Sequence, residues 1–489
     1  MSRPLNRWAI LVLIAGIPRL LSAFLLPNTF GDAYVYIRDI GAMSVKLRTG
    51  TFAITDFYGF WLPLYQFLAA VLNVFVGNGF YSGKIVSAVF GVGVCLFVYA
   101  ITDQLTGHRT AALLAFLLIA LSPLHVLTSS SALTDVPHAF FVMASLYCVL
   151  KKRWLVAAIF AALAGLTRVE SWMFIALIPL IQFLRERHVS IPGVLVMLVP
   201  PLFWFYVSWK AAGDWLACFK VRQEYHDWLL VQNPALASFS FYGVLKDSAI
   251  FINSIDIAVL VAALIAGWIV LRKMLWRSGV EDQGQTVLAP VIFFFAFFAL
   301  LVVAYITHQQ PIMFPRYGLI LFSIGIPVLA WAYLKFAHQK GRAARKLLIS
   351  IIVVCVLGAS IQLVGAVGAL NQISAQRAAA EYLQTHFDTK SDTRIFCDEG
   401  TVTVMSGIPA DRFVTSADAP KDREAFLRYL NEKNVIYLVF IPRFDLTPAW
   451  LFPELEYGYG TSHFTPVFHS QTPFVHTNIW LYRFQADER

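Results

Sequence analysis

Long apolar runs recur along almost the whole chain and are separated by short polar connections. A helix needs about 20 predominantly apolar residues to cross the hydrocarbon core of a bilayer. Only 14% of the residues are charged, whereas a soluble domain carries roughly 25%. The runs therefore predict a polytopic α-helical membrane protein. We expect eleven transmembrane helices, at 8–27, 84–102, 110–128, 136–150, 154–167, 170–184, 190–209, 248–271, 288–306, 317–337 and 347–367.

The distribution of Lys and Arg sets the expected orientation of these spans. With the N-terminus in the cytoplasm, the cytoplasmic connections hold almost twice as many Lys and Arg as the outer ones, in fewer than half as many positions. This is the positive-inside asymmetry, and it requires the apolar run 61–76 not to cross the bilayer. We expect that run to be a juxtamembrane or re-entrant element on the outer side. The net charge of +9 fits the same asymmetry, and no basic patch with interleaved aromatics indicates nucleic acid as a partner.

The composition changes after residue 370. Residues 371–489 are richer in charged side chains and predict a small α/β domain, which an odd number of spans places outside the cytoplasm. The expected organisation is a transmembrane domain at 1–370, including an outer loop at 28–82, followed by this extracytoplasmic domain. Its predicted elements are helices at 374–387 and 421–432, strands at 393–398 and 434–441, and a terminal hairpin of 464–470 with 477–485.

Two acidic residues stand at the outer boundary of predicted spans. Asp32 follows the first span within GDAYVYIRDI, and Asp135 lies at the outer end of the third within SSSALTDVPHAFF. Either could simply cap a helix N-terminus. Alternatively, the two carboxylates could act on a substrate hydroxyl as catalytic groups or share a divalent cation, Mg²⁺ or Mn²⁺. His138 lies one helical turn beyond Asp135 and is a candidate substrate contact.

Arg168 and Glu170 interrupt an otherwise apolar stretch, in the sequence LTRVESW. Ionisable side chains at membrane depth are costly unless they are paired or line a cavity. One interpretation is a structural ion pair that holds two half-spans together. The other is that Arg168 faces an anionic group of a substrate, while Glu170 orients Arg168 or a substrate hydroxyl.

Basic residues at the same outer level are candidate phosphate ligands. Arg316, in PRYGLI, is the only Lys or Arg in the predicted loop 307–316, and Tyr317 follows it. It could snorkel to the interface, but a guanidinium fork also matches phosphate oxygens. Lys84, at the outer end of the second span, is a further candidate. Acids and isolated cations at one membrane face suit transfer chemistry, since a phosphate leaving group needs a cation and an incoming hydroxyl needs a base.

These motifs together resemble the GT-C membrane glycosyltransferases, in particular the branch of protein O-mannosyltransferases and aminoarabinose transferases. The similarity lies in GDAYVY, WLPLYQFLAAVLNVFVGNGFYSGKIVSAVFG, LTGHRTAALLAFLLIALSPLHVLTSSSALTDVPHAFF, TRVESW and PRYGLI. The tail phrase YLQTHFDTKSDTRIFCDEGTVTVMSG is similar to the soluble domain of many bacterial members. The resemblance thus covers nearly the whole chain.

The resemblance implies a GT-C fold and transfer of a sugar from a polyprenyl-phosphate carrier, generally with inversion at the anomeric carbon. It implies that Asp32 is a base or metal-linked acid, that Asp135 is the second outer acid, and that Arg316 lies near the carrier phosphate. The chain departs from many members because Asp32 is followed by Ala33 and not by Glu, so the metal requirement stays open.

Two other functions would also use a polytopic membrane protein. A transporter or flippase of a lipid-linked glycan would use similar spans, but the inverted repeat common in transporters is not visible in the sequence. A scaffold with a partner-binding C-terminal domain would not need acids and cations gathered at one face. The expected partners are the lipid-linked donor, an acceptor lipid, glycan or protein, and the lipids of a bacterial or archaeal cell membrane.

Overall fold

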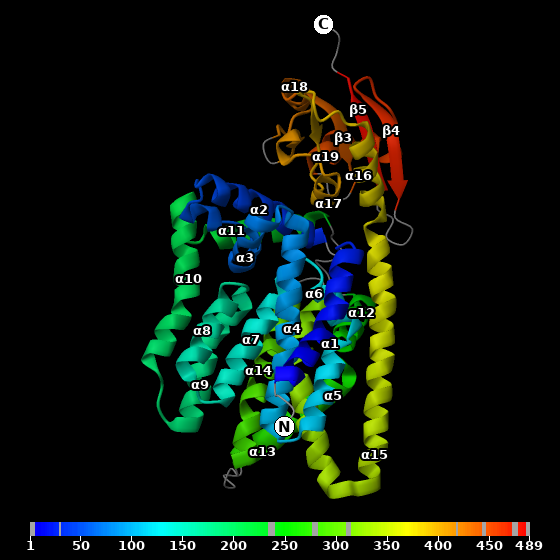
Figure 1. Cartoon of the computed structure of the whole chain (residues 1–489). Coiled ribbons are helices and arrows are strands. Elements are labelled where there is room, and N and C mark those ends of the chain that lie inside the picture. Colours follow the sequence, from blue (N-terminus) through cyan, green and yellow to red (C-terminus); the bar gives the residue numbers. More distant parts are fainter. Residues whose placement is uncertain are drawn as a thin grey trace. The chain divides into compact units, whose positions relative to one another are not determined.

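The computed structural model describes residues 5–28, 31–232, 240–275, 282–309, 314–416, 419–442, 446–471 and 478–485 (Figure 1). Parts of the predicted connections 1–7, 28–82, 210–247, 271–287 and 307–316, and position 477 of the predicted hairpin, lie outside these residues. The chain packs as two compact units. One is Met1–Leu26 with Ile40–Val364, and the other is Pro27–Asp39 with Gly365–Arg489.

The first unit is helical. Among the described residues, six helices are long and apolar enough to cross a membrane, or up to eight if each of two bent helix pairs forms one span, so the predicted count of eleven is not confirmed. Its α-helices are α1 (Leu5–Leu25), the later part of α2 (Gly31–Thr49), α3 (Leu64–Val76), α4 (Gly79–Thr106), α5 (Arg109–Ala120), α6 (Pro123–Ser129), α7 (Asp135–Leu150), α8 (Trp154–Gly165), α9 (Phe174–Glu186), α10 (Ile191–Ala212), α11 (Ala217–Gln232), α12 (Phe241–Ile255), α13 (Ile257–Leu275), α14 (Asp282–Ile306) and most of α15 (Leu319–Gln372).

Two predicted spans are broken. The run predicted at 110–128 divides into α5 and α6, which meet at 62°, and the run at 248–271 divides between α12 and α13, which meet at 82°. The first break lies at Leu121 and Ser122, where the Ser122 side chain caps α6 by accepting from the backbone N–H of His125. Apolar composition is the same on both sides of each break, so hydropathy alone joins the halves.

A buried arginine stabilises the first break. Arg19 of α1 is fully buried, and its guanidinium donates to the backbone carbonyls of Ile119 and Ala120 at the end of α5 and lies 2.6 Å from Nδ1 of His125. The last carbonyls of a helix have no partner within the helix and attract a cation. Arg19 therefore satisfies groups that the bend would leave unpaired in an apolar interior.

The second unit is an α/β domain. Its five strands, β1 (Arg394–Phe396), β2 (Phe413–Val414), β3 (Val435–Phe440), β4 (Phe464–Gln471) and β5 (Asn478–Phe484), lie in the order β2-β1-β3-β5-β4. Strands β1, β2 and β3 are parallel, whereas β5 pairs antiparallel with both β3 and β4. The α-helices are α16 (Ser374–His386), α17 (Gly400–Met405), α18 (Arg423–Glu432) and α19 (Leu446–Leu451). The predicted helices, strands and terminal hairpin are thus present within one or two residues of their expected ends.

Candidate functional site

Asp135 is the first residue of α7, directly after the N-cap residue Thr134. The sequence left open whether this carboxylate caps the helix or does chemistry. In the structure its Oδ1 accepts a hydrogen bond from Nη1 of Arg168 at 3.1 Å, and its side chain is only 7% exposed. The carboxylate is therefore engaged by a side chain from another part of the fold.

Arg168 reaches Asp135 because the helical conformation is interrupted at this residue. It lies between α8 and the 3-10 helix η2 (Val169–Met173), in an extended conformation with φ −148° and ψ 139°. Its Nη2 and Nε also donate to Oε1 of Glu170, at 2.6 and 3.2 Å. The ion pair with Glu170 that the sequence suggested is thus present, and the same guanidinium bridges two carboxylates.

His138 occupies the next turn of α7 and is buried. Its Nε2 lies 2.7 Å from Oγ of Ser171, which belongs to η2. This contact joins the start of α7 to the turn that carries Arg168 and Glu170. It fixes the distance between α7, which carries Asp135, and η2, which carries Glu170.

Arg316 and Tyr317 lie in the 3-10 helix η4 (Pro315–Gly318), immediately before α15. The guanidinium carbon of Arg316 is 5.5 Å from the centre of the Tyr317 ring, and that of Arg168 is 5.7 Å from the same ring. Gly318 lets η4 approach α12, because a Cβ there would lie 1.9 Å from Oγ of Ser254. The aromatic ring of Tyr317 therefore contacts both guanidinium groups.

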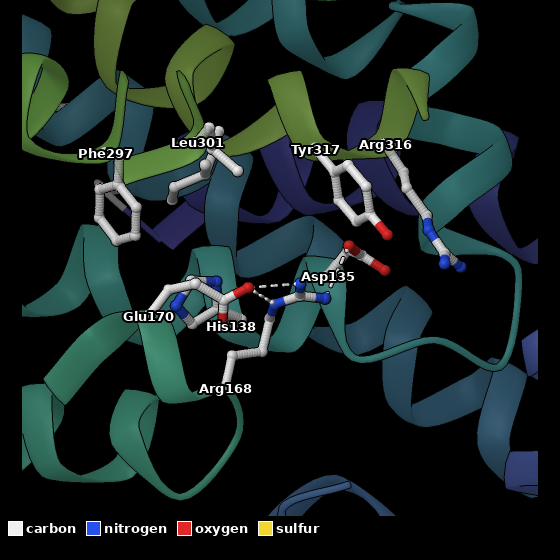
Figure 2. A pocket seen from close by; sticks show the side chains of 9 residues that line it. Asp135, His138, Arg168, Glu170, Phe297, Leu301, Arg316 and Tyr317 are labelled. Atoms are coloured by element: carbon white, nitrogen blue, oxygen red, sulfur yellow. Dashed lines mark hydrogen bonds and ion pairs between the residues drawn. The ribbon is translucent and has the colours of Figure 1, made fainter. Parts of the chain in front are cut away.

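These residues line one pocket, which encloses about 330 Å³, including space open to solvent (Figure 2). Figure 2 shows the acidic and basic side chains converging on it, with Phe297 and Leu301 on another side. Two carboxylates and two guanidinium groups give the pocket a balanced formal charge. The lining residues are Asp135, His138, Arg168, Glu170, Phe297, Leu301, Arg316, Tyr317 and Ile320.

Lys84 has a different environment. Its side chain is fully buried, and Nζ donates to the backbone carbonyls of Ala23 and Leu26 at 2.9 and 2.5 Å, beside the Phe80 ring. The ammonium group thus satisfies carbonyls at the end of α1. A phosphate contact at Lys84 stays a prediction.

Asp32 lies in the first turn of α2 and belongs to the second compact unit. No group of three or more His, Cys, Asp or Glu in the described ranges could hold a metal ion. Asp135 already pairs with a guanidinium, which is a poor setting for a divalent cation. A metal shared by Asp32 and Asp135 stays a prediction.

Comparison with known proteins agrees with the resemblance seen in the sequence. Residues 63–178 match the dolichyl-phosphate-mannose-protein mannosyltransferase family. Over 99% of both chains, the structure superimposes on ArnT from Cupriavidus metallidurans bound to undecaprenyl phosphate, with 13% identity and a TM-score of 0.59, and on its apo form with a TM-score of 0.58. The chain has a GT-C fold. An arabinofuranosyltransferase, AftD from Mycobacteria, matches with 14% identity over 100% of this chain and 40% of its own, with a TM-score of 0.46.

No curated protein matches the sequence significantly. Within the GT-C fold of this chain, sequence reasoning missed four residues of the site: Ser171, Phe297, Leu301 and Ile320. The three apolar ones carry no signal, since they are single positions inside apolar spans. Ser171 follows Glu170 directly, so a polar run after a break in the apolar pattern could have indicated it.

Proposed function

We propose that this chain is a glycosyltransferase that moves a sugar from a polyprenyl-phosphate carrier to an acceptor at the outer face of the membrane, with inversion at the anomeric carbon. The observation that carries the proposal is the pocket itself. Two acidic and two basic side chains meet there beside an apolar wall, in a fold shared with a protein solved with undecaprenyl phosphate.

The charge of the pocket suits a carrier phosphate. Asp135, Glu170, Arg168 and Arg316 balance formally, so a bound phosphodiester adds one negative charge. When the sugar leaves, the carrier becomes a phosphate monoester and its charge increases. Arg316 is buried next to Tyr317, and the five donors of a guanidinium match phosphate oxygens. We assign Arg316 to the phosphate, where it stabilises the charge that develops as the bond to the sugar breaks.

Asp135 is the residue we assign to the acceptor. In a single displacement, an acceptor oxygen forms a bond to the anomeric carbon while the bond from that carbon to the phosphate oxygen breaks. The acceptor proton goes to a carboxylate, and the electron pair leaves with the carrier phosphate. Arg168 holds one oxygen of Asp135 and thereby orients the carboxylate, with Glu170 fixing Arg168 in turn. Asp32 is the other proposed base.

The apolar wall has a separate role. Phe297 of α14 and Ile320 of α15 border the charged groups, and apolar side chains at that place suit the first isoprene units of a polyprenyl tail. They also keep water away from the anomeric carbon, which favours transfer over hydrolysis.

Mass spectrometry of glycolipids and glycoproteins from cells with and without the gene tests this function. We expect one glycosylated product to disappear and its lipid-linked donor to accumulate. NMR of the product tests inversion, since the anomeric configuration must be opposite to that of the donor. Unchanged glycan profiles together with loss of lipid translocation would favour a flippase instead.

A further inference from the structure

The turn that carries Asp32 packs in the same compact unit as the C-terminal residues. This unit joins Pro27–Asp39 to Gly365–Arg489, although the whole first unit separates them in sequence. The first turn of α2 is therefore held by the α/β domain. The contacts within this unit show how.

One contact within this unit joins α2 to the start of α17. Gly400 is the first residue of α17, and a Cβ built on it would lie 3.7 Å from Cγ2 of Val35 and 4.0 Å from the Val35 backbone nitrogen. A methyl group fits at such distances, but a longer side chain would press on the α2 backbone. Val35, three residues beyond Asp32, therefore lies close to Gly400.

Tyr34 directly precedes Val35 in α2. Its side chain is fully buried, and its hydroxyl donates to the backbone carbonyl of Asn28 at 3.2 Å. Burial raises the pKa of Tyr34, while the charge of Arg377 in α16 lowers it and that of Glu399 raises it. The phenol therefore lies near groups from both α16 and the beginning of α17.

Hydrogen bonds fix the conformation at the start of α17. Glu399 caps the helix, with Oε1 accepting from the backbone N–H of Thr401 at 3.2 Å. Asp398, just before it, accepts from the backbone N–H of Ser416 at 2.6 Å. Strand β1 leads directly into this corner, so the sheet of the domain fixes the position of Gly400.

We propose that the C-terminal α/β domain positions Asp32 for sugar transfer, through a packing contact formed by Tyr34, Val35 and Gly400. This role rests on the proposed transferase function, because it assigns the domain a part in that reaction. Tyr34, Val35 and Gly400 are positioning residues that touch no substrate. They act by fixing the turn in which Asp32 lies.

Gly400→Leu tests this packing contact, with Gly400→Ala as the matched control. A small displacement of a catalytic group lowers the rate strongly, so we expect the Leu variant to lose about tenfold in kcat with an unchanged donor KM. The Ala variant should stay within about twofold of the original, since its methyl group fits. Both are measured on the full chain in lipid vesicles, normalised to folded protein. Equal kcat values for the two variants would overturn the positioning role.

A cysteine pair tests the contact without relying on activity. In the full chain carrying Val35→Cys and Gly400→Cys, oxidation should form a disulfide, and the cross-linked protein should keep the kcat of its reduced form. Failure to cross-link, or a loss of kcat that a reductant restores, would show that this packing contact is absent from the active conformation. If the double-cysteine protein forms the cross-link but the chain without substitutions transfers no sugar, the proposed function is wrong and the contact is still confirmed.

Discussion

Nη1 of Arg168 lies 3.1 Å from Oδ1 of Asp135, and Nη2 of the same guanidinium lies 2.6 Å from Oε1 of Glu170. One arginine from the break between α8 and η2 thus orients the carboxylate that begins α7. Three residues that each looked unusual in the sequence form a single connected group. Their arrangement gives Asp135 a fixed direction in the pocket, which a general base requires.

Asp135→Asn should abolish most of the transfer activity. Asparagine keeps the shape and can still accept from Arg168, so the fold should persist, but its amide cannot take the proton of an acceptor. General-base catalysis contributes roughly 10² to 10⁴-fold, and we expect a loss of that order in kcat. The initial rate of carrier release measures it. A rate within twofold of the original would remove Asp135 from the mechanism.

Arg168→Lys keeps the positive charge but replaces a planar fork by a point charge, which cannot bridge two carboxylates in the same geometry. We expect kcat to fall by about tenfold or more, while the donor KM changes little, since orientation affects the reaction step. Glu170→Gln is the companion variant, because Arg168 then keeps its contact to Asp135. Its loss should be smaller, and an equal or greater loss would show that Glu170 itself acts on the substrate.

Arg316→Ala should weaken donor use. Because we propose Arg316 as a phosphate ligand, its removal should cost stabilisation of both the bound donor and the leaving group, so the donor KM should rise and kcat should fall, with kcat/KM lower by about 10²-fold. Titration of the rate with the lipid-linked donor separates the two effects. The exposed Arg109 supplies a control, since Arg109→Ala removes a cation away from the pocket. The assignment fails if the two alanine variants behave alike.

How far the sequence predicts the structure differs between the two units. The apolar pattern located β3 and the terminal pair β4 and β5, because short runs rich in β-branched and aromatic residues mark strands in a soluble domain. It did not locate the breaks at Leu121 and Asp256, since both halves of each run are apolar. A local signal existed for the first break in Arg19, an arginine inside an apolar span.

The charged residues of the pocket were predicted individually, but their arrangement was not. Asp135, Arg168 and Arg316 were each expected at the outer boundary, because ionisable groups there interrupt apolar runs. That Arg168 pairs with Asp135 depends on the extended backbone at residue 168, which hydropathy does not encode. The contact between Val35 and Gly400 joins distant parts of the sequence, and neither residue carries a charge that would have drawn attention to it.

The partly buried Glu399 predicts a pH dependence in the C-terminal domain. Burial raises the pKa of Glu399 above its ordinary value of about 4.3. The folded domain therefore holds this proton more tightly than the unfolded chain, and the resulting stability is present below pH about 4 and lost as pH rises through the raised pKa. Glu399→Gln stays neutral and should be more stable than the original at pH 7, with the difference disappearing at acid pH.

Hydrogen exchange of the α17 peptide in the full chain, corrected for intrinsic rates, measures this difference. Glu424→Gln is the control, because Glu424 is exposed in α18 and its substitution should leave the protection of α17 unchanged. Equal protection of α17 in Glu399→Gln and Glu424→Gln at pH 7 would contradict the argument.

Thiol labelling tests the expected orientation. The native cysteines are all buried, so introduced ones can be read against a low background. Lys390→Cys in the C-terminal domain should react with an impermeant maleimide added to intact cells, because we expect that domain outside. Lys152→Cys, in an exposed turn before α8, should react only after the membrane is opened. The reverse pattern would invert the topology and place the pocket on the cytoplasmic side.

The most direct measurement is carrier release by the purified chain. The protein is placed in vesicles with total polyprenyl-phosphate-linked sugars and a membrane extract as acceptor source, and the lipids are followed by mass spectrometry. We predict that free polyprenyl phosphate appears in step with a glycosylated acceptor, and that Asp135→Asn stops both. Intact donor that only changes leaflet, with no free carrier formed, would contradict the central claim.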